Sequence, residues 1–285
     1  MLVLVTGATG KQGGAVAQKL LDSGHQVRAL TRKVGSESAA DLREQGAEVV
    51  GGTLDDPESL RLAAEGVDAI FGMTTPFEAG MDAEVRQGRN LVDAAESLSV
   101  PLVFTSVAWA YSNSGIPHFE TKWQTEKYLT SKDIPHTILG PGFFMENTTA
   151  PWTLPALRDQ GVLAVPLTAK VPVACIAVGN IADAVVYALE NPDQMNGKRF
   201  DLAGEIYSGE HLSRMLSEVT GRKIGYYEVD KSAVQDDDLR VMFEWYESEK
   251  PTVDIPALQA AFPGVHFYTC REWVESQNWS ELLGS

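Results

Sequence analysis

Short apolar runs alternate with helical patterns from the N-terminus to about residue 142. Six runs are predicted to form strands: 3–6, 26–31, 47–52, 67–73, 101–106 and 136–142. Helical patterns lie between them, among them 39–45, 82–97 and 118–131, and Asp56-Pro57 can cap and open a further helix. Apolar strands that are each followed by a helix are typical of a parallel sheet covered on both faces. Since crossovers between parallel strands are right-handed, the pattern predicts a doubly wound α/β fold.

The alternation of strand-like and helical patterns changes after about residue 143. Prolines and aromatics become frequent, and the segments 181–191, 198–204 and 208–221 predict a helix, a strand and a helix. We therefore expect a main domain over 1–147, to which later strands and helices return, and a smaller C-terminal α/β region over 148–285 that binds substrate.

Three glycines stand three apart directly after the first strand. Gly7 permits a tight turn, Gly10 lets the backbone approach a diphosphate, and Gly13 lets the next helix pack close to the strand. Backbone N–H groups and the positive end of the helix dipole then face the phosphates. The turn predicts a dinucleotide-binding Rossmann fold, with cofactor contacts from Gly7, Thr9, Gly10, Lys11, Gln12 and Gly13.

The second strand ends at Thr31 and is followed by Arg32 and Lys33. Chains that bind a free ribose 2′-hydroxyl usually place Asp or Glu about 20 residues after the glycine turn. A carboxylate there would repel a 2′-phosphate, whereas the planar fork of arginine can grip one. Arg32 and Lys33 therefore predict NADP(H) as the cofactor, and the alternative is a solvated basic pair.

Further cofactor contacts are expected at the ends of later strands, because ligands of this fold lie outside the carboxyl ends of the strands. Asp55 follows the third strand, and Thr74, Thr75 and Pro76 follow the fourth.

Charge and composition narrow the range of partners. The net charge of −16 disfavours binding to nucleic acid or to an anionic lipid surface. The two cysteines and five histidines show no ligand spacing, so no metal is expected. No apolar run approaches the roughly 20 residues of a membrane span, and no basic segment precedes the first apolar run, so we expect a cytoplasmic protein. A monomer and a homodimer both stay open.

The motifs together resemble a known family. The glycine turn, Ser106 at the end of the fifth strand, HFETKWQTEKYL and GPGFFMEN are similar to the atypical short-chain dehydrogenases/reductases, in particular to their NmrA-like branch. The resemblance extends over most of the chain and is strongest up to Asn147. That branch includes NADP(H)-sensing regulators and small reductases of quinones and dyes. The resemblance implies cofactor contacts from Lys122, Pro141, Gly142 and Phe143.

The same resemblance implies candidate catalytic residues. Active short-chain reductases place Tyr and Lys one helical turn apart, and a serine polarises the substrate carbonyl. This chain keeps Lys122 and Ser106 but has His118 where the Tyr would stand. His118 is either a general acid, since imidazole titrates near neutral pH, or a helix-start residue without a chemical role. Tyr111 or Tyr207 can also replace the phenol through the fold.

Several side chains are candidates for substrate contact. Aromatic and polar residues after the fifth and sixth strands can line a pocket above a nicotinamide, or belong to the core: Trp109, Tyr111, Phe144, Asn147 and Trp152. Glu146 and Asn147 can orient a substrate or cap a turn.

Three functions are compatible with these residues. The first is an NADPH-dependent reductase of a small conjugated acceptor such as a quinone, an aldehyde or an imine. The second is a regulatory protein that senses NADP(H) and docks a protein partner without turnover. The third is a non-redox enzyme that catalyses isomerisation or cyclisation.

Overall fold

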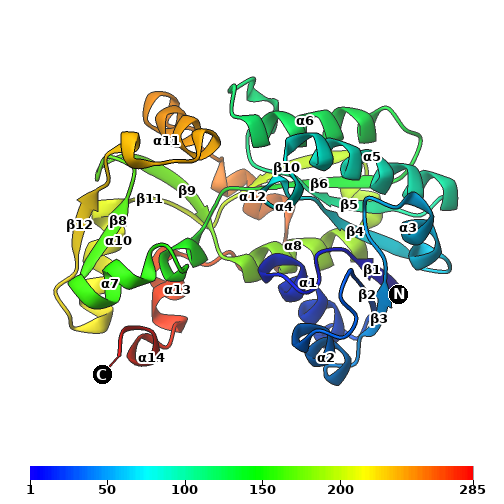
Figure 1. Ribbon diagram of the computed structural model, residues 1–285, viewed down its shortest axis with the longest axis horizontal. Coiled ribbons are helices and arrows are strands. Elements are labelled where there is room, and N and C mark those ends of the chain that lie inside the picture. The colour runs from blue at the N-terminus through cyan, green and yellow to red at the C-terminus, as the bar shows by residue number, and fades with distance from the viewer. Residues whose placement is uncertain (285) are drawn as a thin grey trace. The chain divides into compact units, whose positions relative to one another are not determined.

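A computed structural model describes residues 1–284. It contains two compact units (Figure 1). Unit 1 comprises residues 1–113, 117–140 and 181–201, and unit 2 comprises 114–116, 141–180 and the residues from 202 onward.

Unit 1 is built on a seven-stranded sheet with the order β10-β6-β5-β4-β1-β2-β3. The strand pairs from β1 to β6 are parallel. The bounds are β1 Leu2–Val5, β2 Gln26–Thr31, β3 Glu48–Gly51, β4 Ala69–Met73, β5 Leu102–Thr105, β6 His136–Pro141 and β10 Lys198–Leu202. The order 3-2-1-4-5-6 is that of the dinucleotide-binding fold, and it reverses direction beside β1. The predicted doubly wound α/β fold is confirmed.

Helices cover both faces of this sheet (Figure 1). In the figure α3, α5 and α6 lie on one face, and α1 and α8 lie on the other. The helices of this unit are α1 Lys11–Asp22, α2 Glu37–Glu44, α3 Pro57–Ala64, α4 Pro76–Ala79, α5 Met81–Leu98, α6 Pro117–Thr130, α9 Pro192–Met195 and most of α8 Val178–Glu190. A 3-10 turn, η1, covers Ala110–Ser112.

Local sequence explains where these elements begin. Asp56 caps α3 by accepting a hydrogen bond from the Glu58 N–H, and Pro57 opens the helix as predicted. Ser36 caps α2 in the same way. Val3, Leu4 and Val5 of β1 are fully buried, which places the glycine turn at the edge of the core.

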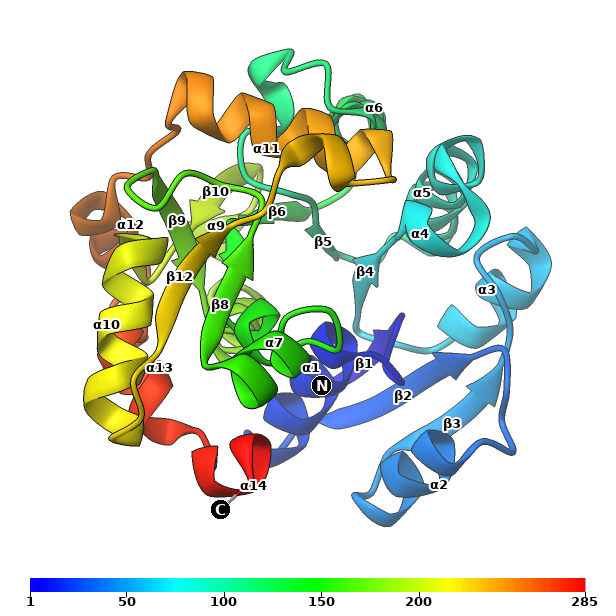
Figure 2. The same cartoon turned by 60° about the vertical axis from the view of Figure 1, so that its left-hand side comes forward.

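Unit 2 contains two small sheets. β9 (Pro172–Ile176) pairs antiparallel with β11 (Glu205–Ser208) and parallel with β7 (Phe143–Phe144). β8 (Val162–Val165) pairs parallel with β12 (Gly225–Glu228), as Figure 2 shows. The helices are α7 Leu154–Gln160, α10 Gly209–Thr220, α11 Asp237–Glu249, α12 Ile255–Ala261, α13 Cys270–Ser276 and α14 Trp279–Leu283, with the 3-10 turns η2 Met145–Thr149 and η3 Lys231–Ala233.

The domain boundary expected at residue 147 stays a prediction, and the two compact units divide after Gly140. The change comes after Gly140, because β6 ends at Pro141 and the next residues form β7, which pairs with β9 of unit 2. Residues 181–201 return to unit 1 and add β10 to its sheet. Among the helices of residues 1–284, none has the length and hydropathy to span a bilayer.

Candidate nucleotide-binding and active site

The glycine turn brings the start of α1 against the end of β1. Gly7 has a φ of +65°, in the left-handed region that favours glycine. A Cβ built at Gly13 would lie 2.2 Å from the Gly7 carbonyl oxygen, so only glycine permits this approach. The Gly10 N–H donates to the same oxygen at 2.9 Å. The predicted roles of Gly7 and Gly13 in turn and packing therefore have a direct geometric basis.

The backbone N–H groups at the N-terminus of α1 face the space beside the glycine turn. Its N-cap is Gly10, which has no side chain to satisfy the first N–H groups of this 12-residue helix. Thr9, Gly10 and Lys11 are exposed. Gln12 is buried, and its Nε2 donates to Thr105 Oγ1 at 2.8 Å, so its side chain ties α1 to the end of β5. The arrangement suits an anion.

Arg32 lies directly beyond β2 and forms an exposed ion pair. Its Nη2 is 2.6 Å from Glu78 Oε2, and the two side chains are 63% and 55% exposed. Exposed pairs of this kind contribute little free energy, so an incoming phosphate can displace Glu78 at small cost. The Lys33 N–H donates to Thr31 Oγ1, which fixes the backbone beyond the strand.

The residues expected after β3 and β4 differ in their surroundings. Asp55 accepts hydrogen bonds from Arg86 at 2.8 Å and from Gln87 at 2.9 Å. The bond from Arg86 lowers the pKa of Asp55 below its usual range. Thr74 and Pro76 are buried, and Thr75 is the N-cap of α4.

Lys122 is the centre of a buried polar cluster. Its Nζ lies 2.5 Å from the Thr74 carbonyl oxygen, 3.0 Å from Thr74 Oγ1 and 2.9 Å from Glu84 Oε1. Glu84 is fully buried and also accepts hydrogen bonds from the Thr74 and Thr121 hydroxyls. An ammonium group has three N–H donors, and all three have partners here. Lys122 therefore joins α6 to the end of β4 and to α5.

Ser106 belongs to a second buried cluster. Its hydroxyl donates to the buried Glu126 carboxylate, which also accepts from Arg199 Nε at 2.8 Å. Arg199 Nη1 also donates to Asp201 Oδ1 at 2.5 Å, and Asp201 Oδ2 accepts a hydrogen bond from the Tyr111 hydroxyl at 3.0 Å. The Ser106 proton thus points at a carboxylate within unit 1 and is not available to polarise a carbonyl.

The charges of this second cluster shift the pKa values of Arg199 and Tyr111. Burial lowers the pKa of Arg199, but the Asp201 and Glu126 carboxylates outweigh burial and leave it raised. Burial first, and the Asp201 charge second, raise the pKa of Tyr111. The Tyr111 phenol therefore stays protonated at neutral pH, with its proton given to Asp201.

His118 lies in the first turn of α6, one helical turn before Lys122. Its ring is half-buried, 5.9 Å from the Phe77 ring and 4.8 Å edge-on from the Phe119 ring. The Thr121 hydroxyl donates to the His118 carbonyl oxygen, which is a helix-start contact. These contacts are compatible with both roles considered for this residue.

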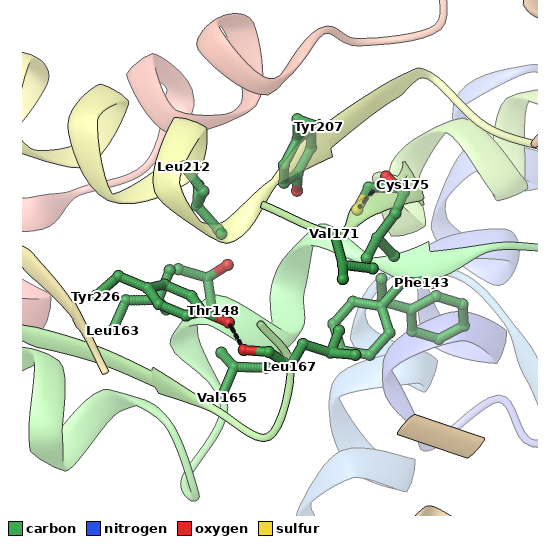
Figure 3. Close-up of a pocket in the computed structure, with 13 residues that line it drawn as sticks. Phe143, Thr148, Leu163, Val165, Leu167, Val171, Cys175, Tyr207, Leu212 and Tyr226 are labelled. Atoms are coloured by element: carbon green, nitrogen blue, oxygen red, sulfur yellow. Dashed lines mark hydrogen bonds between the residues drawn. The ribbon is translucent and has the colours of Figure 1, made fainter. Parts of the chain in front are cut away.

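The segment after β6 has little free space at its start. A Cβ at Gly142 would lie 2.4 Å from the Ala174 carbonyl oxygen, and the Gly142 N–H donates to the Leu202 carbonyl oxygen. Pro141 is buried, while Phe143 and Phe144 are half-buried and line a cavity within unit 2 (Figure 3).

The remaining candidates for substrate contact differ in their own surroundings. Trp109 is buried and its backbone N–H donates to Asp201, so it belongs to the core of unit 1. Trp152 is 73% exposed, unlike the wall of an apolar pocket. Asn147 is half-buried, and its carbonyl oxygen accepts from the Ala150 N–H.

Glu146 has a structural position. Its Oε1 accepts from the Val178 N–H at 2.9 Å, at the start of α8, and from Trp273 Nε1 at 3.2 Å. A carboxylate at a helix N-terminus is favourable. Of the two roles considered for Glu146, these contacts favour the capping role. Within residues 1–284, no group of three or more His, Cys, Asp or Glu side chains could hold a metal ion.

Sequence reasoning missed the buried acids Glu84 and Glu126. Acidic residues on amphipathic helices are usually solvated, and no motif marked these two. For Glu84, its position relative to apolar residues of the same helix was a usable signal of burial. Glu84 shares one helical face with Gly88, Leu91 and Ala95, all of which are buried.

Curated relatives include proteins with different named functions. A photosystem II assembly factor of Synechocystis sp. is 31% identical over 210 residues, which are 72% of this chain and 63% of that protein. The chain therefore spans less than two thirds of that relative. A (4-alkanoyl-5-oxo-2,5-dihydrofuran-3-yl)methyl phosphate reductase of Streptomyces griseus is 31% identical over 237 residues, 82% of this chain and 79% of that protein.

Solved structures share the fold. NmrA, a negative transcriptional regulator in complex with NADP, has a TM-score of 0.81 at 19% identity, over 96% of this chain and 94% of that one. The triphenylmethane reductase of Citrobacter sp., complexed with NADP(H), has a TM-score of 0.78 at 24% identity, over 96% and 99%. The model of the NmrA-like family matches residues 1–265. The chain therefore belongs to the NmrA-like family of atypical short-chain dehydrogenases/reductases.

Proposed function

We propose that this protein is an NADPH-dependent reductase of a small conjugated acceptor such as a quinone, an aldehyde or an imine. The proposal depends on two observations at the nucleotide site. The start of α1 lies against the glycine turn without a side-chain cap, and Arg32 occupies the position where proteins that bind a free ribose 2′-hydroxyl have Asp or Glu. The reductase among the curated relatives supports it.

The glycine turn fits a dinucleotide diphosphate. A Cβ at Gly13 would fill the space that brings α1 to the turn, and the first N–H groups of α1 need an acceptor. We assign the diphosphate contacts to Gly7, Thr9, Gly10, Lys11 and Gly13. Gln12 contributes by tying α1 to Thr105. Arg32 exchanges Glu78 for the 2′-phosphate, and Lys33 adds charge beside it.

The nicotinamide half is assigned to the ends of β4 and β6. Thr74, Thr75, Pro76, Pro141, Gly142 and Phe143 are the proposed contacts. Lys122 positions Thr74 for its cofactor contact, because the Lys122 ammonium donates to both the carbonyl oxygen and the hydroxyl of that residue. A direct contact from Lys122 to the ribose requires that one of its three present partners be exchanged.

The hydrogen bond from Ser106 to Glu126 favours conjugated acceptors as substrates. Bound NADPH supplies a hydride. Ser106 gives its proton to Glu126 and His118 replaces the family tyrosine, so acid assistance at the acceptor is weak. A conjugated acceptor that receives a hydride at the far end of its conjugated system becomes a delocalised anion, which can collect its proton from water. A simple ketone would become an alkoxide and needs a positioned acid.

The test is NADPH consumption with a panel of acceptors. Purified protein is mixed with NADPH and quinones, conjugated aldehydes, conjugated imines or unconjugated ketones, and the loss of reduced-cofactor absorbance is followed. We expect turnover with the conjugated acceptors and about tenfold or more lower kcat/KM with ketones, since general acid catalysis contributes at least that much. Cofactor that binds and is never consumed above background would refute the reductase proposal.

A regulatory role is the second candidate. The observation that favours it is the complete pairing of Lys122 together with His118 at the tyrosine position. In this role the protein binds NADP(H), distinguishes its redox state and docks a protein partner. Unequal affinities for NADP+ and NADPH, with no turnover and a pull-down that depends on the cofactor, would distinguish it from the reductase.

A further inference from the structure

An ion pair within unit 1 joins two segments that follow non-adjacent strands. Arg32 is the first residue after β2, and Glu78 lies on α4, which follows β4. β1 pairs with both strands and therefore lies between them, as Figure 2 shows. Because neighbouring strands are about 4.8 Å apart, the Arg32–Glu78 pair bridges two strand spacings at the carboxyl edge of the sheet.

Glu78, rather than Asp55, is the carboxylate that occupies Arg32. Asp55 accepts hydrogen bonds from Arg86 at 2.8 Å and from Gln87 at 2.9 Å. The bond from Arg86 is the main cause that lowers the pKa of Asp55, and the charge of Arg32 is a minor one. The Asp55 charge is therefore compensated by its own partners, whereas Glu78 contacts the Arg32 guanidinium directly at 2.6 Å.

The ends of α4 leave its exposed side room to shift. The helix has four residues, and Gly80 at its C-terminus has a φ of +87°. Beyond its chain neighbours, a Cβ built at Gly80 would meet no atom of residues 1–284 within 4 Å. Pro76 is buried, whereas Phe77 is 62% exposed. The Arg32–Glu78 pair thus ties the exposed side of a short helix to the end of β2.

A phosphate and a carboxylate compete unequally for one guanidinium. A phosphate monoester carries between one and two negative charges near neutral pH and accepts a bidentate pair from arginine. It is therefore a stronger partner for Arg32 than the Glu78 carboxylate. A neutral ribose 2′-hydroxyl is a weaker partner than that carboxylate, so a dinucleotide without the 2′-phosphate leaves the pair in place.

We propose that Glu78 is a specificity-determining residue that competes with the 2′-phosphate of NADP(H) for Arg32, so that only the phosphorylated dinucleotide frees α4 from the end of β2. The inference rests on the proposed function for the assignment of Arg32 to that phosphate. It connects the adenosine half of the cofactor with α4, whose Thr75 and Pro76 are the proposed nicotinamide contacts. It also reaches Phe77, whose ring lies 5.9 Å from the ring of His118.

Calorimetry with NADP+ and NAD+ tests the competition, because the two differ only in the 2′-phosphate. Glu78→Gln keeps the shape of the side chain and removes its charge. We expect the Kd for NADP+ to fall about two- to fivefold, the equivalent of one exposed ion pair, and the Kd for NAD+ to stay unchanged. Glu58→Gln is the matched control, since Glu58 forms an exposed ion pair with Arg61 on α3.

A second background shows whether the effect passes through Arg32. In the Arg32→Gln variant there is no pair to break, so Glu78→Gln should tighten NADP+ binding less than it does in the wild type. An equal gain in both backgrounds would assign the effect to the charge of Glu78 alone and overturn the competition.

Fluorine NMR tests the release of α4. The chain is labelled with 4-fluorophenylalanine, and Phe77→Leu identifies the signal of Phe77. The probes are adenosine 2′,5′-bisphosphate and adenosine 5′-monophosphate, which both lack the nicotinamide half. We expect the bisphosphate to shift the Phe77 signal and the monophosphate to leave it in place. Glu78→Gln without nucleotide should move the signal toward its position with the bisphosphate.

The outcomes separate this inference from the proposed reductase, because none of the measurements uses turnover. An unchanged Kd for NADP+ in Glu78→Gln, an equal gain for NAD+, or a Phe77 signal that answers both nucleotides or neither would each overturn the assignment of Glu78. A protein that binds no NADP+ loses both proposals. If the expected effects appear and NADPH is never consumed, the assignment stands and the reductase proposal fails.

Discussion

At the scale of single residues, this protein buries charged side chains at helix positions where the sequence pattern predicts apolar ones. Lys122 and Glu84 form an ion pair with side-chain exposures of 9% and 0%. Two hydroxyls, from Thr74 and Thr121, complete the hydrogen bonds of Glu84. A buried charge is tolerated only when it is paired and hydrogen-bonded, which makes each member dependent on the other.

The Lys122–Glu84 pair gives a stability prediction. Lys122→Ala leaves a fully buried carboxylate without its cation, and we expect a loss of about 3–5 kcal/mol in the free energy of unfolding. Lys122→Met combined with Glu84→Gln should recover most of that loss, because no buried charge remains. Urea unfolding of the single and double variants measures both. Equal stability of the Lys122→Ala variant and the wild type would show that the pair is not buried in solution.

Arg32 gives a prediction about cofactor choice. Arg32→Glu should weaken NADPH binding by about tenfold or more, the equivalent of one lost charge-assisted hydrogen bond. NADH binding should be weakened much less or strengthened, since it carries no 2′-phosphate. Calorimetry with both cofactors measures the ratio, and Arg43→Glu, on α2, is the control for net charge. An equal loss for NADPH and NADH would contradict the assignment.

At the scale of elements, the contact between β1 and α1 determines the nucleotide site. The two elements approach through glycine backbone, and the Gly13 position leaves no room for a methyl group. Because the atoms that would clash are backbone atoms of Gly7 and Thr6, no side-chain movement can relieve the contact.

Gly13→Ala should therefore move α1 away from the turn. We expect destabilisation of about 1–3 kcal/mol and a loss of NADPH affinity of at least about tenfold, because the first N–H groups of α1 leave the diphosphate. The control is Gly179→Ala in α8. Among residues 1–284, no atom apart from its chain neighbours and the nearby backbone of its own helix lies within 4 Å of a Cβ built there, so this change should stabilise the protein by about 0.5–1 kcal/mol. Wild-type NADPH affinity in Gly13→Ala would exclude the turn as the diphosphate site.

At the scale of the whole molecule, acidic residues outnumber basic ones by 39 to 23. Many of the basic side chains are committed to exposed ion pairs, such as Arg61 with Glu58 and Arg240 with Asp237. Exposed pairs contribute little, whereas the net charge of −16 repels itself throughout the folded chain.

Salt should consequently stabilise the protein. Raising the ionic strength from about 0.01 M to about 0.15 M shortens the Debye length from about 30 Å to about 8 Å. Screening of the net repulsion should raise the midpoint of thermal unfolding by several degrees. Calorimetric scans at both ionic strengths test this. A midpoint that falls with salt would mean that the exposed ion pairs outweigh the net repulsion.

Much of the fold could be predicted because its signals are local. The alternation of apolar runs and helical patterns gave all six strands from β1 to β6 and the long helices α5 and α6, within one or two residues of their ends. The glycine turn is likewise encoded within seven consecutive residues. The strands of unit 2 were largely missed, because β7, β8 and β12 have only two or four residues each and pair across long stretches of chain.

The sequence by itself determined the doubly wound sheet, the turn before α1 and the absence of an acid after β2. Tertiary structure alone decided what Lys122 and Ser106 do, since their partners stand 48 and 20 residues away along the chain. It also decided that alternate residues of β8 and β9 enclose one apolar cavity. Strand and helix periods act over a few residues, whereas the partners of a buried charge and the walls of a cavity come from segments that only folding brings together.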